Sequence, residues 1–105
     1  MDRVSVVADA DGPLRVVLRG EIDYANAAQI TRTIREAIAA HRPKAVEVDL
    51  SAVVLLDSSG IGVLVNAMRA AEEVGSAYRV EGPNRKVRDQ LRITGLLEPF
   101  GLAGP

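Results

Sequence analysis

The amino-acid sequence predicts an α/β fold: one mixed sheet of four or five strands with helices packed on it, in the order β-β-α-β-α-β-α. Two observations support this prediction. The chain has 105 residues, which is the size of one domain. Strand-like and helix-like hydrophobic patterns alternate along it. Hydrophobic residues make up 48% of the chain and aromatic residues only 3%, so the core must be aliphatic.

The first two predicted strands form a hairpin. Residues 4–8 are mostly apolar and are followed by residues 9–12, where Asp and Gly favour a tight turn. Apolar Leu14, Val16 and Leu18 then alternate with Arg15, Val17 and Arg19. This repeat of two residues is typical of a half-buried strand. We expect this strand to end at Gly20 and to pair antiparallel with the first.

The first predicted helix extends to about His41. Asp23 is the expected N-cap, because its side chain can accept a hydrogen bond from a backbone N–H of the first turn. Apolar residues recur at helical spacing from Ala27 onward, and Pro43 stops the helix. His41 is expected at the C-terminal end, where the helix dipole favours a cationic side chain.

The second half continues the alternation of strands and helices. We expect a strand around Val46–Leu50, a second apolar run at 53–56, a helix over about 58–74, a strand around Tyr78 and a last helix after Asn84. The strands joined by helices should run parallel in one sheet. Residues from about 97 to 105 contain two glycines and two prolines, so we expect a loosely ordered tail.

Composition excludes several classes of function. The chain has no cysteine and one histidine, so it offers no disulfide, thiolate metal site or histidine cluster. A net charge of −1 and few aromatics argue against direct nucleic-acid binding. We see no signal peptide and no apolar run of membrane-spanning length, and therefore expect a cytoplasmic protein. The basic residues Arg79, Arg85, Lys86, Arg88 and Arg92 form either a solvated face or a partner-docking surface.

The segment from Asp57 to Gly62 is the candidate site. It follows a buried apolar run and opens a helix, at the edge of the sheet where α/β proteins place functional groups. Ser58 lies at the helix N-terminus, where the dipole would accommodate a phosphate. Gly60 and Gly62 in the first turn together indicate close approach of another body to that backbone, either a partner or the chain's own sheet. An N-cap followed by a buried helix accounts for most of these residues equally well.

The helix after Asp57 is apolar around most of its circumference. Its polar residues are confined to a stripe near Asn66, Arg69 and Glu73. Such a helix is either buried on two sides or presents a face of small residues to a partner.

At these residues the sequence resembles the STAS domain, and within it the bacterial anti-sigma factor antagonists. The resemblance covers nearly the whole chain as a single domain, residues 1–105. Four segments in order are similar to family motifs, namely residues 16–23, 46–51, 56–64 and 93–96. The short end after Phe100 departs from the family, many members of which have a final helix there.

The resemblance implies a mechanism in which this chain is a binding protein and not an enzyme. The unmodified antagonist would bind an anti-sigma factor, which then releases its sigma factor. That partner is typically a serine kinase that uses ATP; it would phosphorylate Ser58 and abolish binding, and a serine phosphatase would reverse the modification. We expect the partner to contact a set of residues around that serine: Asp23, Asp57, Ser59, Gly60, Gly62 and Asn66. No cofactor is expected, and weak self-association is compatible with the sequence.

There are two alternative functions. An unphosphorylated STAS subunit of a transport or signalling complex would share the fold, but the Asp57-Ser58 pair is the phosphorylatable form. An enzyme with Ser58 as nucleophile lacks a Gly-x-Ser-x-Gly elbow and a nearby histidine base. The sequence also contains no Gly-x-x-x-x-Gly-Lys phosphate loop, although some STAS domains bind nucleotides.

Overall fold

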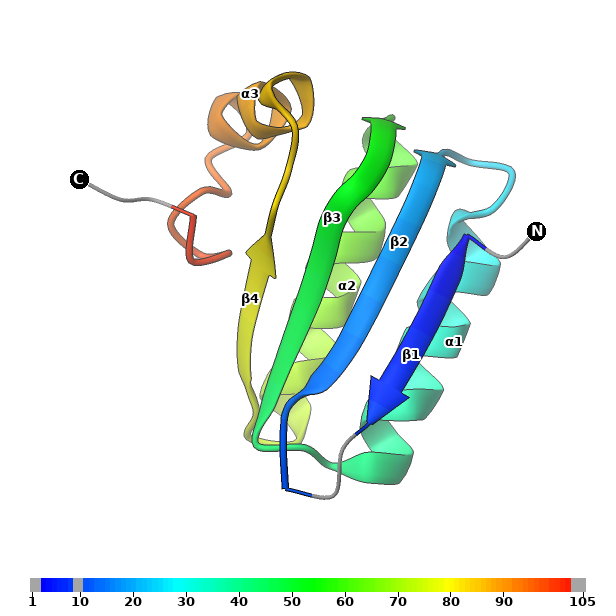
Figure 1. Cartoon of the computed structure of the whole chain (residues 1–105), viewed down its shortest axis with the longest axis vertical. Coiled ribbons are helices and arrows are strands. Elements are labelled where there is room, and N and C mark those ends of the chain that lie inside the picture. The colour runs from blue at the N-terminus through cyan, green and yellow to red at the C-terminus, as the bar shows by residue number, and fades with distance from the viewer. Residues whose placement is uncertain (1–2, 9–10, 103–105) are drawn as a thin grey trace.

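The computed structural model describes residues 3–8 and 11–102 and contains one four-stranded sheet with the order β1-β2-β3-β4 (Figure 1). β1 (Val4–Ala8) pairs antiparallel with β2 (Leu14–Ile22). β2 pairs parallel with β3 (Ala45–Leu56), and β3 pairs parallel with β4 (Ala77–Glu81). The predicted fold class, the hairpin and the parallel pairs are confirmed.

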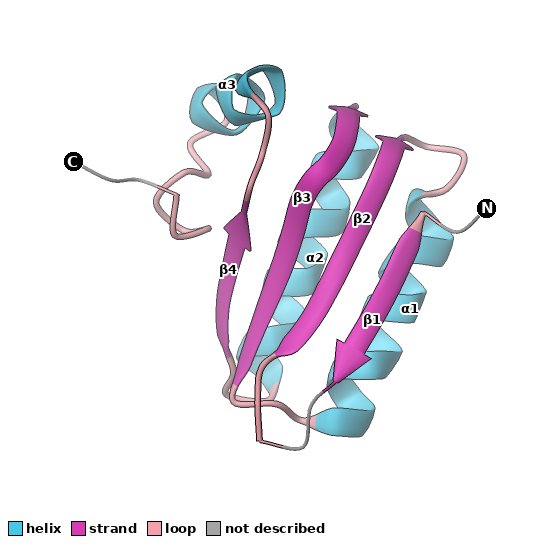
Figure 2. Cartoon of the chain, in the orientation of Figure 1, coloured by secondary structure: helices cyan, strands magenta, loops and turns pink. Residues whose placement is uncertain are grey.

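Two long helices lie behind the same face of the sheet (Figure 2). α1 (Ala27–His41) connects β2 to β3, and α2 (Ser58–Glu73) connects β3 to β4. Each helix returns the chain to the opposite end of the sheet, as parallel pairing requires. The short helix α3 (Arg85–Ile93) follows β4 and lies at the end of the sheet where β2 and β3 finish (Figure 1).

The core between sheet and helices is aliphatic, as the composition predicts. Ile30, Ile34 and Ile38 recur on one face of α1 and are fully buried, because that face packs on α2 and the sheet. Along β2 and β3 alternate residues point to the same side, and those on the helix side are buried: Leu14, Val16, Leu18, Val46, Val48 and Leu50.

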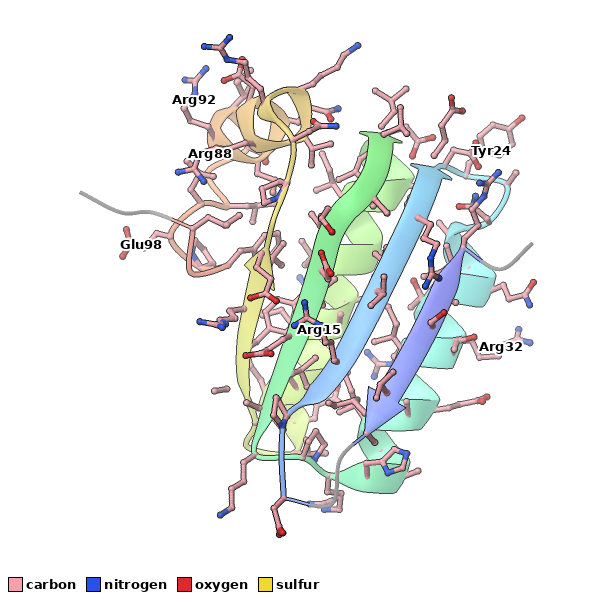
Figure 3. All side chains as sticks on the ribbon, in the orientation of Figure 1. Arg15, Tyr24, Arg32, Arg88, Arg92 and Glu98 are labelled. Carbon is pink, nitrogen blue, oxygen red and sulfur yellow. The ribbon has the colours of Figure 1, made fainter. Side chains whose placement is uncertain are left out.

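The other face of the sheet carries a network of ion pairs. Arg15 on β2 contacts Glu47, Asp49 and Glu81 on β3 and β4, at distances of 3.3, 3.1 and 2.6 Å (Figure 3). Arg79 on β4 contacts Glu47 at 3.0 Å and Glu81 at 3.3 Å. These charges make the uncovered face compatible with water, so the sheet needs helices on one side only.

Both central strands are longer than predicted. β2 continues through Gly20 to Ile22, since Gly20 has φ +73° at an irregularity in the pairing and not at a strand end. The two apolar runs around Leu50 and at 53–56 belong to one strand, β3. The extension brings Ile22 and Leu56 into register at the last positions of their strands.

The segment after α3 packs on the sheet. Phe100 is fully buried, its ring lies edge-on to Tyr78 at 5.8 Å, and its carbonyl oxygen accepts the N–H of Val80 at 2.9 Å. Leu96, Leu97 and Leu102 pack against the core as well. The expectation of a loosely ordered tail is therefore wrong for residues 97–102, and residues 103–105 lie outside the described residues. This segment forms turns, and no helix follows Ile93 in the described part of the chain.

Candidate functional site at the N-terminus of helix α2

Two neighbouring parallel strands end side by side and place two acidic residues together. Ile22 of β2 and Leu56 of β3 are paired, and Asp23 and Asp57 are the next residues in each strand's direction. The Asp57 N–H donates to the Ile22 carbonyl oxygen at 3.2 Å, which extends the sheet contact into the site. The predicted location at the end of the sheet is confirmed by this pairing.

Asp57 is the N-cap of α2, as predicted. Its Oδ1 atom accepts the N–H of Gly60 at 3.0 Å, and its carbonyl oxygen accepts the N–H of Ile61 at 3.0 Å. Its second carboxylate oxygen, Oδ2, accepts the N–H of Tyr24 at 3.1 Å. One half-buried carboxylate thus joins the start of α2 to the loop after β2.

Asp23 does not cap α1, and this part of the prediction is wrong. The helix begins at Ala27 with Asn26 as the N-cap residue. Asp23 instead closes a turn, since its Oδ1 atom accepts the N–H of Ala25 at 3.0 Å. The Asn26 side chain points backward: Oδ1 accepts the Asp23 N–H at 3.0 Å and Nδ2 donates to the Glu21 carbonyl at 2.9 Å. The loop is held by its own polar groups beside the start of α2.

Ser58 is the first residue of α2 and is exposed, whereas Ser59 is half-buried. Ser58 is thus an exposed hydroxyl-bearing residue at the positive end of a 16-residue helix. Figure 3 shows Tyr24 at the same end of the sheet, where β2 and β3 finish. The Tyr24 N–H is bonded to the Asp57 side chain, so the backbone of this exposed tyrosine lies beside Asp57, the residue before Ser58.

The two glycines of the first turns have different roles. Gly60 is buried, and a Cβ atom there would lie 2.6 Å from the Ile22 carbonyl oxygen. Of the two bodies expected to approach Gly60, a partner or the chain's own sheet, the structure shows the sheet, because β2 fills the space. Gly62 is half-buried, and a Cβ atom there would meet nothing within 4 Å. Gly62 is consequently the glycine that leaves open space on the surface.

α2 is buried on two sides, against α1 and against the sheet. Val63, Leu64, Ala67, Ala70 and Ala71 are buried, while Ile61, Val65 and Met68 are partly buried. Asn66 is half-buried, and its Nδ2 atom donates to the Gly62 carbonyl at 2.9 Å, so it shares a helix face with Gly62. Of the two predicted arrangements for an apolar helix, burial on both sides is the one observed.

Sequence reasoning missed the roles of Tyr24 and Asn26. Tyr24 is one of only three aromatic residues, which was a signal for it. Asn26 is a preferred N-cap residue directly before Ala27, but its side chain bonds back to Asp23 and Glu21 and makes no cap bond. The sequence-based prediction also grouped Arg79 with the basic residues of α3. Arg79 belongs to the ion-pair network of the sheet, so the basic cluster consists of Arg85, Lys86, Arg88 and Arg92 on α3 alone.

Comparison with known proteins identifies the class of this fold and site. The family model described as the STAS domain matches residues 5–103, and the chain belongs to that family. None of the helices that the structure describes is both long and apolar enough to cross a membrane.

Within the family, the chain is similar to anti-sigma factor antagonists. It is 33% identical over 104 residues to the anti-sigma-F factor antagonist RsfB of Mycobacterium tuberculosis, covering 96% of this chain and 82% of RsfB. An anti-sigma factor antagonist from Mycobacterium paratuberculosis has a similar structure, with 30% identity and a TM-score of 0.71 over 92% of this chain and 82% of that one. The phosphorylated form of the Bacillus cell fate determinant SpoIIAA shares the fold, with 24% identity and a TM-score of 0.72 over 92% of this chain and 86% of that one.

Proposed function

We propose that this chain is an anti-sigma factor antagonist whose unmodified form binds an anti-sigma factor and thereby frees a sigma factor. The observation that carries the proposal is the exposed Ser58 at the start of α2, beside Asp57 and the loop of Asp23. The antagonists to which the chain is similar at 30% identity or more support the same function. We expect it to act in the cytoplasm.

Phosphorylation of Ser58 is the proposed switch. A phosphate adds a charge of about −1.5 to −2 at neutral pH. It would stand next to the carboxylates of Asp23 and Asp57, and a partner surface that fits a neutral hydroxyl would meet a concentrated negative charge. The start of α2 favours the phosphate electrostatically, so the fold should survive the modification while binding is lost.

Both oxygens of the Asp57 carboxylate are already bonded to backbone N–H groups. This supports a structural role for Asp57, with Ser58 as the residue that is modified. Asp57 would hold the serine in place and would need no rearrangement when the phosphate arrives. The remaining surface around Ser58 is the proposed contact for the partner, and it includes Asp23, Ser59, Gly62 and Asn66, all half-buried. Gly60 would serve indirectly by letting α2 approach β2.

The chemistry would belong to the partners and not to this chain. We propose that the anti-sigma factor is a serine kinase that transfers a phosphoryl group from ATP to the Ser58 hydroxyl, and that a serine phosphatase removes it. His41 is the last residue of α1, which has 15 residues and hence a length of about 22 Å. Since α1 begins beside Asp23, its single histidine lies at the far end of the helix and offers no base to Ser58.

A kinase assay tests the proposal. The chain is mixed with each serine-kinase anti-sigma factor of its source organism and ATP, and the modified residue is located by mass spectrometry. We expect one of these kinases to bind the chain and to modify Ser58, with Ser59→Ala still modified and Ser58→Ala not modified. Modification of neither serine by any kinase would favour the alternative, an unphosphorylated STAS subunit of a transport or signalling complex.

A further inference from the structure

Three of the four exposed large hydrophobic side chains that the structure describes belong to segments at the end of the molecule that holds Ser58, whereas Val7 on β1 pairs with Arg15 near the opposite end. Four such side chains are found among the described residues, and they are Val7, Tyr24, Val54 and Ile93, with exposed fractions of 54%, 83%, 61% and 74%. The backbone of Tyr24 lies beside Asp57, the residue before Ser58, because its N–H is bonded to the Asp57 side chain. Val54 and Ile93 belong to β3 and α3; Val54 lies outside the four segments that resemble family motifs, and Ile93 begins the last of them.

Hydrogen bonds place Val54 and Ile93 beside the site. Asn84, the N-cap of α3, donates from Nδ2 to the Val54 carbonyl at 3.3 Å. Six residues later Gln90 donates from Nε2 to the Leu56 carbonyl at 2.7 Å. Both ends of α3 are therefore held against the last residues of β3, and Ile93, its last residue, follows three positions after Gln90.

α3 also brings positive charge to this surface. Lys86 and Ile93 are seven residues apart and hence lie on one face of the helix, the face that Gln90 shares. Lys86 and its neighbour Arg85 are exposed, and no carboxylate of the described residues is at ion-pair distance from either of them. In Figure 3, Arg88 of α3 and Tyr24 of the loop after β2 lie on opposite sides of the ends of β2 and β3. That loop carries the acidic residue Asp23.

We propose that Val54, Arg85, Lys86 and Ile93, here called the α3 patch, form the second half of the docking surface that begins at Ser58. Its occupant is the anti-sigma factor of the proposed function, on which this inference rests. That partner would place apolar side chains against Val54 and Ile93 and acidic side chains against Arg85 and Lys86. Arg85 and Lys86 have no acidic partner among the described residues, and the patch lies at the same end of the sheet as Ser58. Both features support a partner surface that is acidic and partly apolar.

Two pairs of matched variants test the patch. Val54→Thr is compared with Val7→Thr, because both change a half-exposed valine on a strand and Val7 lies on β1. Lys86→Glu is compared with Lys44→Glu, because both lysines are exposed and Lys44 precedes β3 at the opposite end of the sheet. Ile93→Ser is the strongest single truncation. Binding to the anti-sigma factor that captures the wild-type chain is measured by calorimetry at low and moderate salt.

We expect Ile93→Ser to weaken binding by about tenfold or more, as for an interface anchor. Lys86→Glu should weaken binding more at low salt than at moderate salt, whereas Val7→Thr and Lys44→Glu should bind as wild type does. Thermal unfolding of every variant shows whether a loss of binding is a loss of fold; loss of binding with unchanged unfolding supports the patch. If wild type and all α3-patch variants bind equally, the inference is wrong and the proposed function stands. If wild type binds no anti-sigma factor, both fail.

Discussion

The Asp57 carboxylate bonds the Tyr24 backbone N–H at 3.1 Å and thereby ties the loop after β2 to the first turn of α2. The same carboxylate accepts the Gly60 N–H at 3.0 Å. The surface around Ser58 is thus built from two chain segments that one side chain holds together. The shape of this surface, as well as its charge, therefore depends on Asp57.

Asp57→Ala should destabilise the protein and loosen the loop. The change removes an N-cap and a charge-assisted bond, and we expect a loss of about 1–2 kcal/mol in the free energy of unfolding. Chemical denaturation measures this loss, and hydrogen exchange at Tyr24 reports the loop separately. Asp57→Asn keeps one acceptor oxygen and should lose less. Equal stability of Asp57→Ala and wild type would contradict the described role.

The two glycines of α2 should respond oppositely to alanine. Gly60→Ala pushes a Cβ atom to 2.6 Å from the Ile22 carbonyl oxygen, and separating α2 from β2 should cost about 1–3 kcal/mol. Gly62→Ala meets nothing within 4 Å and should gain about 0.5–1 kcal/mol from helix propensity. Urea denaturation of the pair checks both signs. A neutral Gly60→Ala would show that the contact is not tight.

Phe100 should contribute as a core residue despite its place near the end of the chain. It is fully buried against Tyr78, so Phe100→Ala should cost about 3–5 kcal/mol in the free energy of unfolding. Glu98→Ala, two residues away and exposed, is the matched control and should change stability little. If both variants have the wild-type unfolding midpoint in denaturant, Phe100 does not contribute to the core as described.

Asp49 should make part of the stability sensitive to acid. The N–H of Ser51, which bonds the carboxylate at 2.8 Å, and the guanidinium of Arg15 lower the pKa of Asp49 below its usual 3.8. A depressed pKa stabilises the fold above the unfolded-state value, and this contribution is lost as the pH falls through the folded-state value. Asp49→Asn should therefore lose stability at neutral pH and show a shallower decline below pH 4. Glu98→Gln is the control, because it removes an exposed carboxylate in the same way. This variant should keep the wild-type dependence of stability on pH.

The sequence was sufficient for the fold because the alternating hydrophobic period of β2 and the helical period of α1 are unambiguous. It was less informative where several residues could serve one purpose. Asp23 and Asn26 both favour an N-cap, and only the path of the chain after Ile22 decides between them. Gly60 and Gly62 look alike in sequence, yet only Gly60 faces the end of β2.

Long-range packing was the part that local patterns could not predict. Phe100 lies among glycines and prolines with no helical or strand period around it, so nothing nearby indicates burial against β4. The site was located by its motif, since Asp57 and Ser58 follow a strand directly. The closeness of Tyr24 and the α3 patch to that motif depends on contacts between segments at least 30 residues apart.

The most direct test of the central claim compares the affinity of the anti-sigma factor for the unmodified chain and for the chain phosphorylated at Ser58. Both forms are first shown to have the same circular dichroism and unfolding midpoint. The proposed switch predicts tight binding of the unmodified chain, constitutive binding of Ser58→Ala, and loss of binding by the phosphorylated chain and by Ser58→Asp. Equal affinity of the unmodified and phosphorylated chains would contradict it.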